Sequence, residues 1–273
     1  MTFDLQPTAG VPAGSPPSWT VQQHARAVLA EYALEAEPRG LDVPIAEAGA
    51  AACLSEVLAA ATTRTSASNV AIDQAPVAAS VSPAVALARL KAGNARFVTN
   101  PVSQEKPTAI RRSETAQDQR PFAIIVGCAD SRTAPELVFD QNIGDLFVFR
   151  TAGNLIDDHA LGGIEFAVER LGARLIVVLG HKRCGAVIAA LGSAKPTGHI
   201  GSLVRDIQPA VEAARSKPGD GLANTVKENA NLVAQKIRKE AELGELAPQV
   251  LVVTGYYDLD SGAVEWLAEE PIK

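Results

Sequence analysis

Short apolar runs alternate with longer segments of helical period from about residue 82 onward. Four of the runs are almost continuously apolar, which is typical of parallel strands buried on both faces of a sheet. They are "FAIIVGC" (122–128), "DLFVFRTAG" (145–153), "ARLIVVLGH" (173–181) and "QVLVVTGYYDL" (249–259). In "DLDSGAVEWL", a turn predicted at Ser261 and Gly262 leads into a fifth run, which we expect to be an antiparallel edge strand.

The segments between and before these runs predict helices. The first spans 82–98, where Ser82 caps the helix and Pro83 follows it, and the second spans 158–172. A third, amphipathic helix spans 222–244 and is expected to stop at Gly244. Strands alternating with helices imply right-handed crossovers. The chain is therefore predicted to be an α/β protein, in which four parallel strands and an antiparallel edge strand are flanked by helices.

Residues 1–80 differ in composition from the rest of the chain. They are rich in alanine, and their acidic residues outnumber their basic ones by eight to three. Two helices are plausible, one from Thr20 to Tyr32 and one from Pro44 to about Ala61, followed by a linker. We therefore divide the chain into an extension at 1–80, partly helical or disordered, and an α/β domain at 81–273. A docking arm for a partner or a second subunit is the alternative interpretation of the extension.

Composition excludes several classes of protein. The net charge of −6 argues against a nucleic-acid partner or an anionic membrane surface. No apolar run is long enough to cross a bilayer, and the first residues show no basic leader followed by an apolar segment. Three cysteines cannot form a disulfide framework, so we expect a reducing, cytoplasmic location.

Two of these cysteines follow predicted strands at the ends where functional groups gather in parallel sheets. Cys128 ends the first strand, and the third strand runs into His181-x-x-Cys184. Two thiolates and one imidazole form a three-ligand zinc site that leaves a fourth position open. The alternative is that both cysteines are core residues, as we expect for Cys53.

A charged pair, Asp130 and Arg132, follows Cys128 directly. Side chains two residues apart can turn toward each other once a strand ends, which allows a bidentate contact between carboxylate and guanidinium. An ordinary ion pair is the alternative, or a helix cap at Ser131, because "SRTAPELVFD" continues into a short helix.

Together, "CADSR" and "HKRC" closely resemble the two zinc-binding signatures of the β-class carbonic anhydrases, and the similarity extends over residues 82–270. The resemblance implies that Cys128, His181 and Cys184 bind one Zn²⁺ per subunit. It also implies that Asp130 and Arg132 form the catalytic dyad, with Asp130 as a fourth zinc ligand in a closed state.

Three further residues match features of the plant-like subgroup of that family. Gln119, nine residues before Cys128, matches a glutamine that hydrogen-bonds the substrate, and Phe147 and Phe166 match residues that line the CO2 pocket. Because family members have their sites at subunit interfaces, the resemblance implies a homodimer or homotetramer, with Phe166 reaching the site of the neighbouring subunit.

The function implied by the resemblance is reversible hydration of CO2 to bicarbonate and a proton through zinc-bound hydroxide. One alternative keeps the fold and metal but hydrolyses CS2 or COS, which are similar to CO2. Another is a zinc-stabilised scaffold protein whose extension is the functional part. A nucleotide-binding domain is disfavoured, because no glycine-rich phosphate loop follows the first strand.

Overall fold

The computed structural model describes residues 79, 81–99, 108–193 and 196–272. The chain divides into two units, Met1–Val70 and Ala71–Lys273, and every described residue belongs to the second. The two helices predicted near residues 20–32 and 44–61 lie outside the described residues, as does Cys53. The boundary between residues 80 and 81 stays a prediction.

The sheet has five strands, as predicted from the apolar runs, and the structure places them in the order β2-β1-β3-β4-β5. The first four strands are parallel, and β5 pairs antiparallel with β4 at the edge. Every residue of β1 and β3 is buried, which explains why their sequences are continuously apolar. The strands are β1 (Ala123–Cys128), β2 (Leu146–Thr151), β3 (Leu175–His181), β4 (Leu251–Tyr257) and β5 (Val264–Pro271).

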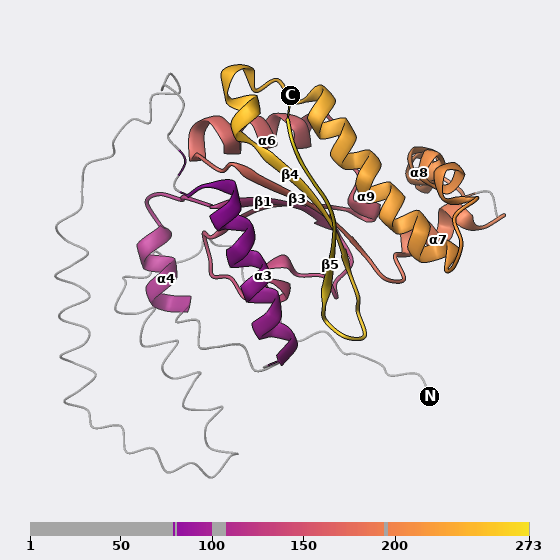
Figure 1. Ribbon diagram of the computed structural model, residues 1–273, viewed down its shortest axis with the longest axis horizontal. Helices are drawn as coiled ribbons and strands as arrows, with labels where there is room; N and C mark the ends of the chain where they lie inside the picture. Colours follow the sequence, from indigo (N-terminus) through magenta and orange to yellow (C-terminus); the bar gives the residue numbers. More distant parts are fainter. Residues whose placement is uncertain (1–78, 80, 100–107, 194–195, 273) are drawn as a thin grey trace, which may run out of the picture. The chain divides into compact units, whose positions relative to one another are not determined.

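Helices cover both faces of the sheet (Figure 1). On one face, α6 and α9 bury Ile164 and Ala230 against Ile124 and its neighbours. On the other, α3 buries Leu90 against Ile125. The helices are α3 (Pro83–Thr99), α4 (Thr108–Thr115), α5 (Pro135–Val138), α6 (Asp158–Leu171), α7 (Gly185–Leu191), α8 (Ile200–Ala214) and α9 (Gly221–Glu240), with 3-10 turns η2 (Ala152–Asn154) and η3 (Gly244–Gln249).

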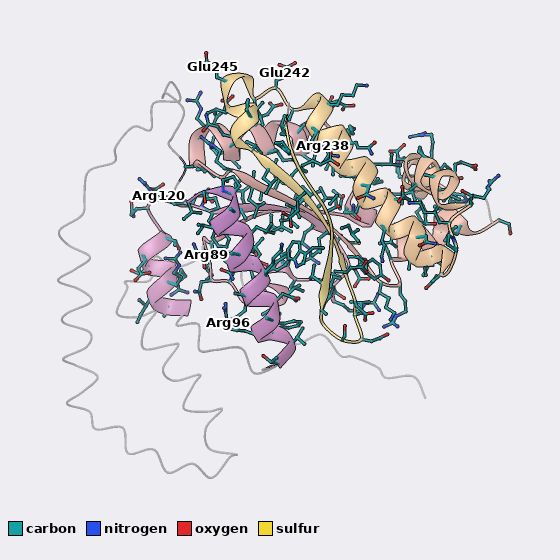
Figure 2. All side chains as sticks on the ribbon, in the orientation of Figure 1. Arg89, Arg96, Arg120, Arg238, Glu242 and Glu245 are labelled. Atoms are coloured by element: carbon teal, nitrogen blue, oxygen red, sulfur yellow. The ribbon has the colours of Figure 1, made fainter. Side chains whose placement is uncertain are left out.

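Several local contacts fix α3 on its face of the sheet. The predicted cap is present, since the hydroxyl of Ser82 accepts a hydrogen bond from the backbone N–H of Val85 at 3.3 Å. Figure 2 labels two arginines of this helix, Arg89 and Arg96. The guanidinium of Arg89 lies 4.0 Å from the centroid of the Phe122 ring, a cation–π contact. These contacts add polar and aromatic anchors to the apolar stripe of α3.

The helices differ from the sequence prediction in two ways. Three of them, α4, α7 and α8, were not predicted, and α8 contains Pro209, a residue that argues against a helix when only the sequence is read. α9 ends at Glu240 rather than at Gly244, and Gly244 instead begins η3 with a φ of 50°. Among the described residues, no helix is long and apolar enough to cross a membrane.

Candidate metal centre

Three elements bring Cys128, His181 and Cys184 to one place. Cys128 is the last residue of β1 and His181 is the last residue of β3. These two strands are neighbours and parallel, so their carboxyl ends meet at the same edge of the sheet. Cys184 directly precedes α7, after a loop of two residues. The convergence expected from the sequence is therefore present.

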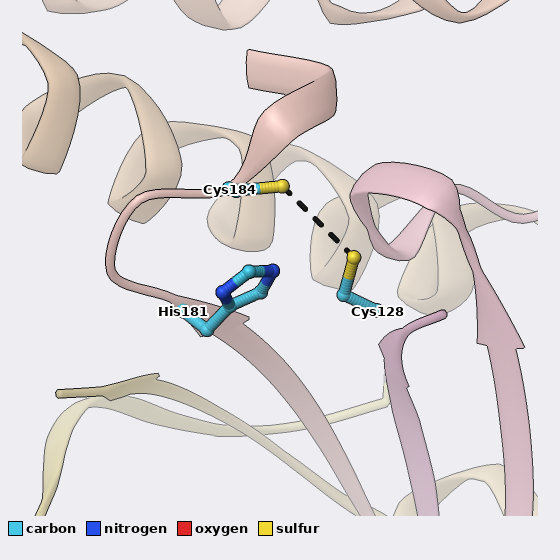
Figure 3. Close-up of side chains that lie close together, drawn as sticks. All are labelled: Cys128, His181 and Cys184. Atoms are coloured by element: carbon cyan, nitrogen blue, oxygen red, sulfur yellow. Dashed lines mark hydrogen bonds between the residues drawn. The ribbon is translucent and has the colours of Figure 1, made fainter. Parts of the chain in front are cut away.

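The three side chains form a compact and buried cluster (Figure 3). Their ligand atoms all lie within 4.8 Å of one another, and the two sulfur atoms are 4.0 Å apart. Cys184 and His181 expose only 1% of their surface and Cys128 exposes 5%. Such a donor set, in which buried sulfur and nitrogen atoms lie close to one another, suits a divalent metal ion.

The imidazole of His181 is held in the form that a metal requires. Its Nδ1 lies 3.0 Å from the carbonyl oxygen of Lys182. A carbonyl only accepts hydrogen bonds, so Nδ1 carries a proton, and in the neutral imidazole Nε2 then presents its lone pair. Nε2 is buried and has no hydrogen-bond partner among the described residues. An orphaned buried acceptor of this kind is what a metal ligand leaves when the ion is removed.

Ionisation of the Cys128 thiol opposes ionisation of the Cys184 thiol. The hydrogen bond with Cys184 lowers the pKa of Cys128 to about 4, with a smaller contribution from His181. The backbone N–H of Gly153 also donates to this sulfur at 3.4 Å. In turn, the neighbouring Cys128 and burial raise the pKa of Cys184. The pair alone therefore holds one negative charge, and a bound cation would stabilise the second thiolate.

Asp130 and Arg132 form the predicted bidentate pair beside this cluster. Nε and Nη2 of Arg132 lie 2.9 and 2.7 Å from the two carboxylate oxygens. These hydrogen bonds hold the pKa of Asp130 well below its usual range. One carboxylate oxygen lies 4.0 Å from Nε2 of His181, so an ionised carboxylate borders the metal ligands.

The turn from Cys128 to Asp130 is held by two residues that the sequence analysis did not identify. Nε of Arg150, on β2, donates to the carbonyl of Cys128 at 2.8 Å, and its Nη2 donates to the carbonyl of Asp130. The hydroxyl of Thr133 lies 3.1 and 2.9 Å from the same two carbonyls. Arg150 stands opposite Gly127 in the register of β1 and β2, one residue before Cys128 and the carboxyl end of β1.

Gln119 and Phe147 lie at the other end of the sheet. Gln119 is exposed and precedes β1, whereas Cys128 ends it. Figure 2 labels the next residue, Arg120, at the end of the sheet away from α7. Phe147 is the second residue of β2 and packs edge-on against Phe149, with ring centroids 5.4 Å apart.

Phe166 lies in α6 and exposes 49% of its surface. A single chain therefore brings together the three candidate metal ligands, Asp130 and Arg132. Substrate contacts by Gln119, Phe147 and Phe166 stay a prediction, which requires a second copy of the chain.

Comparisons with known proteins agree with this geometry. Residues 123–264, just over half of the chain, match the family model of the carbonic anhydrases. A tetrameric β-carbonic anhydrase from Sordaria macrospora has the same fold, with a TM-score of 0.54 at 21% identity over 68% of this chain and 96% of its own. Carbonic anhydrase 2 of Mycobacterium tuberculosis is 40% identical over 190 residues, which make up 66% of this chain and 90% of the relative. The chain belongs to the β-class carbonic anhydrases.

A second mycobacterial relative supports this membership. The carbonic anhydrase of Mycolicibacterium smegmatis is 39% identical over 191 residues, covering 67% of this chain and 92% of its own. The protein is thus a carbonic anhydrase of the β class, and its Cys–His–Cys cluster is compatible with zinc.

Proposed function

We propose that this β-class carbonic anhydrase catalyses the zinc-dependent, reversible hydration of CO2 to bicarbonate and a proton. The observation that supports the proposal is the buried cluster of Cys128, His181 and Cys184, with the ionised carboxylate of Asp130 next to it. These three residues would hold one Zn²⁺ per subunit. A zinc ion held there would act as a Lewis acid and lower the pKa of a water toward neutrality.

The residues of the chain have separate tasks in this reaction. Arg132 keeps Asp130 ionised and fixes its orientation through two hydrogen bonds. Asp130, which is then only an acceptor, can accept a hydrogen bond from the attacking water and so direct its oxygen lone pair at CO2. In a closed state, the same carboxylate would become a fourth ligand of the metal. The pair therefore governs access to the site.

A second copy of the chain would complete the substrate side of the site. We propose a homodimer or homotetramer in which Gln119, Phe147 and Phe166 of one copy serve the metal centre of another, because in a single chain Gln119 and Phe147 lie at the opposite end of the sheet. Gln119 would donate to a substrate oxygen, and the two phenylalanines would line an apolar pocket. Mixing two inactive variants, Gln119→Ala and Cys128→Ala, should restore activity in hybrid oligomers. No recovery after refolding them together would refute the arrangement.

We also assign the protein to the cytoplasm, since the thiols of Cys128 and Cys184 must stay reduced to bind metal. Cell fractionation tests this assignment, and recovery outside the cytoplasm would contradict it.

The decisive experiment for the activity measures zinc content and CO2 hydration on the purified full chain, with COS and CS2 in parallel. The proposal predicts about one zinc per chain and turnover of CO2. Faster turnover of COS or CS2 than of CO2 would favour the hydrolase alternative. A zinc-loaded protein without turnover of any of them would favour a scaffold.

A further inference from the structure

The loop that joins His181, at the end of β3, to Cys184, before α7, consists of two cationic residues, Lys182 and Arg183. Both are paired with acidic residues of the turn that joins β4 and β5. Nζ of Lys182 lies 3.0 Å from Asp258 and 2.9 Å from Asp260. Arg183 donates Nη1 to Asp260 at 3.0 Å and Nη2 to the other oxygen of the same carboxylate. We call these four residues the ionic clamp.

The backbone of this loop is in an unfavourable conformation. Arg183 has a φ of 56°, in the left-handed region that residues with a side chain seldom adopt. This conformation lets the chain reverse between His181 and Cys184, so that both side chains reach the same place. A strained residue of this kind persists only where its surroundings hold it. The bidentate contact with Asp260 is such a restraint, because its two hydrogen bonds fix both position and orientation of the guanidinium.

The other half of the ionic clamp is itself rigid. Oδ1 of Asp258 accepts hydrogen bonds from the backbone N–H groups of Asp260 at 2.7 Å and Ser261 at 3.2 Å. The side chain of Asn94, on α3, bonds to the carbonyl of Gly262 at 2.8 Å and to the N–H of Val264 at 2.9 Å. The β4–β5 turn is therefore fixed from α3, and it presents its carboxylates to the loop from a set position.

We propose that Asp260 is a positioning residue of the metal centre. It acts through Lys182 and Arg183 and holds the loop in the geometry that lets His181 and Cys184 bind one ion. This inference rests on the proposed zinc site. Asp260 is 55% exposed, and exposed ion pairs contribute little to global stability. The effect of breaking the ionic clamp is thus expected at the metal and not in the unfolding of the whole chain.

The neutralising variant Asp260→Asn tests the inference in the full, zinc-loaded chain. It keeps the size of the side chain, and the hydrogen bonds that close the turn belong to Asp258 and not to Asp260. Partners beyond the direct ligands commonly change metal affinity by about 10- to 100-fold. We expect a loss at the lower end of this range, about tenfold in zinc affinity. Competition with a chelator measures this loss. Asp260→Glu, which restores the charge, should recover most of the loss.

A matched control lies on the same pair of strands. Glu265, on β5, accepts hydrogen bonds from Lys227 at 2.8 and 2.7 Å, and it is exposed to a similar degree, 56%. Glu265→Gln makes the same chemical change without touching the ionic clamp. It should leave zinc affinity unchanged. Cobalt(II) bound in place of zinc gives absorption bands sensitive to ligand geometry, and these should change in Asp260→Asn and not in Glu265→Gln.

Three outcomes would overturn the inference. Equal zinc affinities for the wild type and Asp260→Asn would remove Asp260 from the support of the site. Equal losses in Asp260→Asn and Glu265→Gln, with a lower melting temperature in both, would mean general destabilisation. A wild-type chain that binds no zinc would refute the proposed function together with this inference, whereas the first two results leave the proposed function intact.

Discussion

Replacing Arg150 by alanine tests how the cysteine side of the metal centre is held. The change removes two charge-assisted hydrogen bonds, to the carbonyls of Cys128 and Asp130. It leaves Thr133, whose hydroxyl has one proton to share between these carbonyls and whose backbone N–H donates to that of Asp130. A net hydrogen bond from a charged donor contributes about 1.5–3 kcal/mol. Because Arg150 is exposed and Thr133 remains, we expect a total loss of about 2 kcal/mol for the two bonds. If zinc binds only the ordered turn, this loss of about 2 kcal/mol appears in the free energy of zinc binding, and zinc affinity should fall by about 30-fold.

Chelator competition on the purified, full-length variants measures this loss. Arg150→Lys keeps the charge, but a single ammonium cannot reproduce the fork that serves two carbonyls, so it should lose affinity to an intermediate degree. Arg111→Ala is the control, since Arg111 also donates to a backbone carbonyl, that of Ile143 at 2.8 Å, at the other end of the sheet. The reasoning is wrong if Arg150→Ala binds zinc as tightly as Arg111→Ala does.

Further predictions concern the ligands, the dyad and the packing. Cys128→Ala should lose zinc, as measured by elemental analysis, and full metal content would remove this residue from the ligand set. Asp130→Asn should keep zinc but lose about 10²-fold or more in CO2 hydration by stopped flow, and normal turnover would exclude a role. Because its ion pair lowers the pKa of Asp130, the carboxyl is ionised at ordinary pH, so the wild-type rate profile should show no Asp130 titration between about pH 5 and 9. A Cβ at Gly93 would lie 1.8 Å from the carbonyl oxygen of Phe139, so Gly93→Ala should cost at least about 1–3 kcal/mol in urea unfolding, whereas Gly162→Ala, with open space around it, should cost none.

The fold was predictable because its central strands, β1 and β3, are buried on both faces. Continuous apolar runs specified β1 and β3, and the alternation with helices specified a parallel sheet. α8 was not predictable in the same way, since Pro209 interrupts its pattern. Its apolar side chains, Ile207 among them, pack in the same cluster as Cys128 and Cys184, and this tertiary packing outweighs the local preference against a helix.

The convergence of the three candidate metal ligands was predictable from a rule of topology, whereas the contacts that support them were not. Cys128 and His181 end neighbouring parallel strands, and the sequence shows where such strands end. Arg150, on β2, donates a hydrogen bond to the backbone carbonyl of Cys128 at the end of β1. Asp260 lies in the β4–β5 turn, 77 residues along the chain from its partner Arg183. Neither partnership leaves a periodic or compositional signal, because each depends on the register and order of the strands.

The strand order β2-β1-β3-β4-β5 gives the two supports a common logic. Cys128 and His181 end the neighbouring strands β1 and β3, and the next strand outward from each one leads to a residue that holds the adjoining backbone. On the β1 side, Arg150 of β2 holds the turn after Cys128. On the β3 side, Asp260 in the turn after β4 holds the loop that follows His181. The two supports share no hydrogen-bond partner, so the free energies of their loss should add. The double variant Arg150→Ala with Asp260→Asn should therefore lose about 300-fold in zinc affinity, the product of the single losses of about 30-fold and about tenfold. A double variant no weaker than Arg150→Ala alone would mean that the turn and the loop order as one unit.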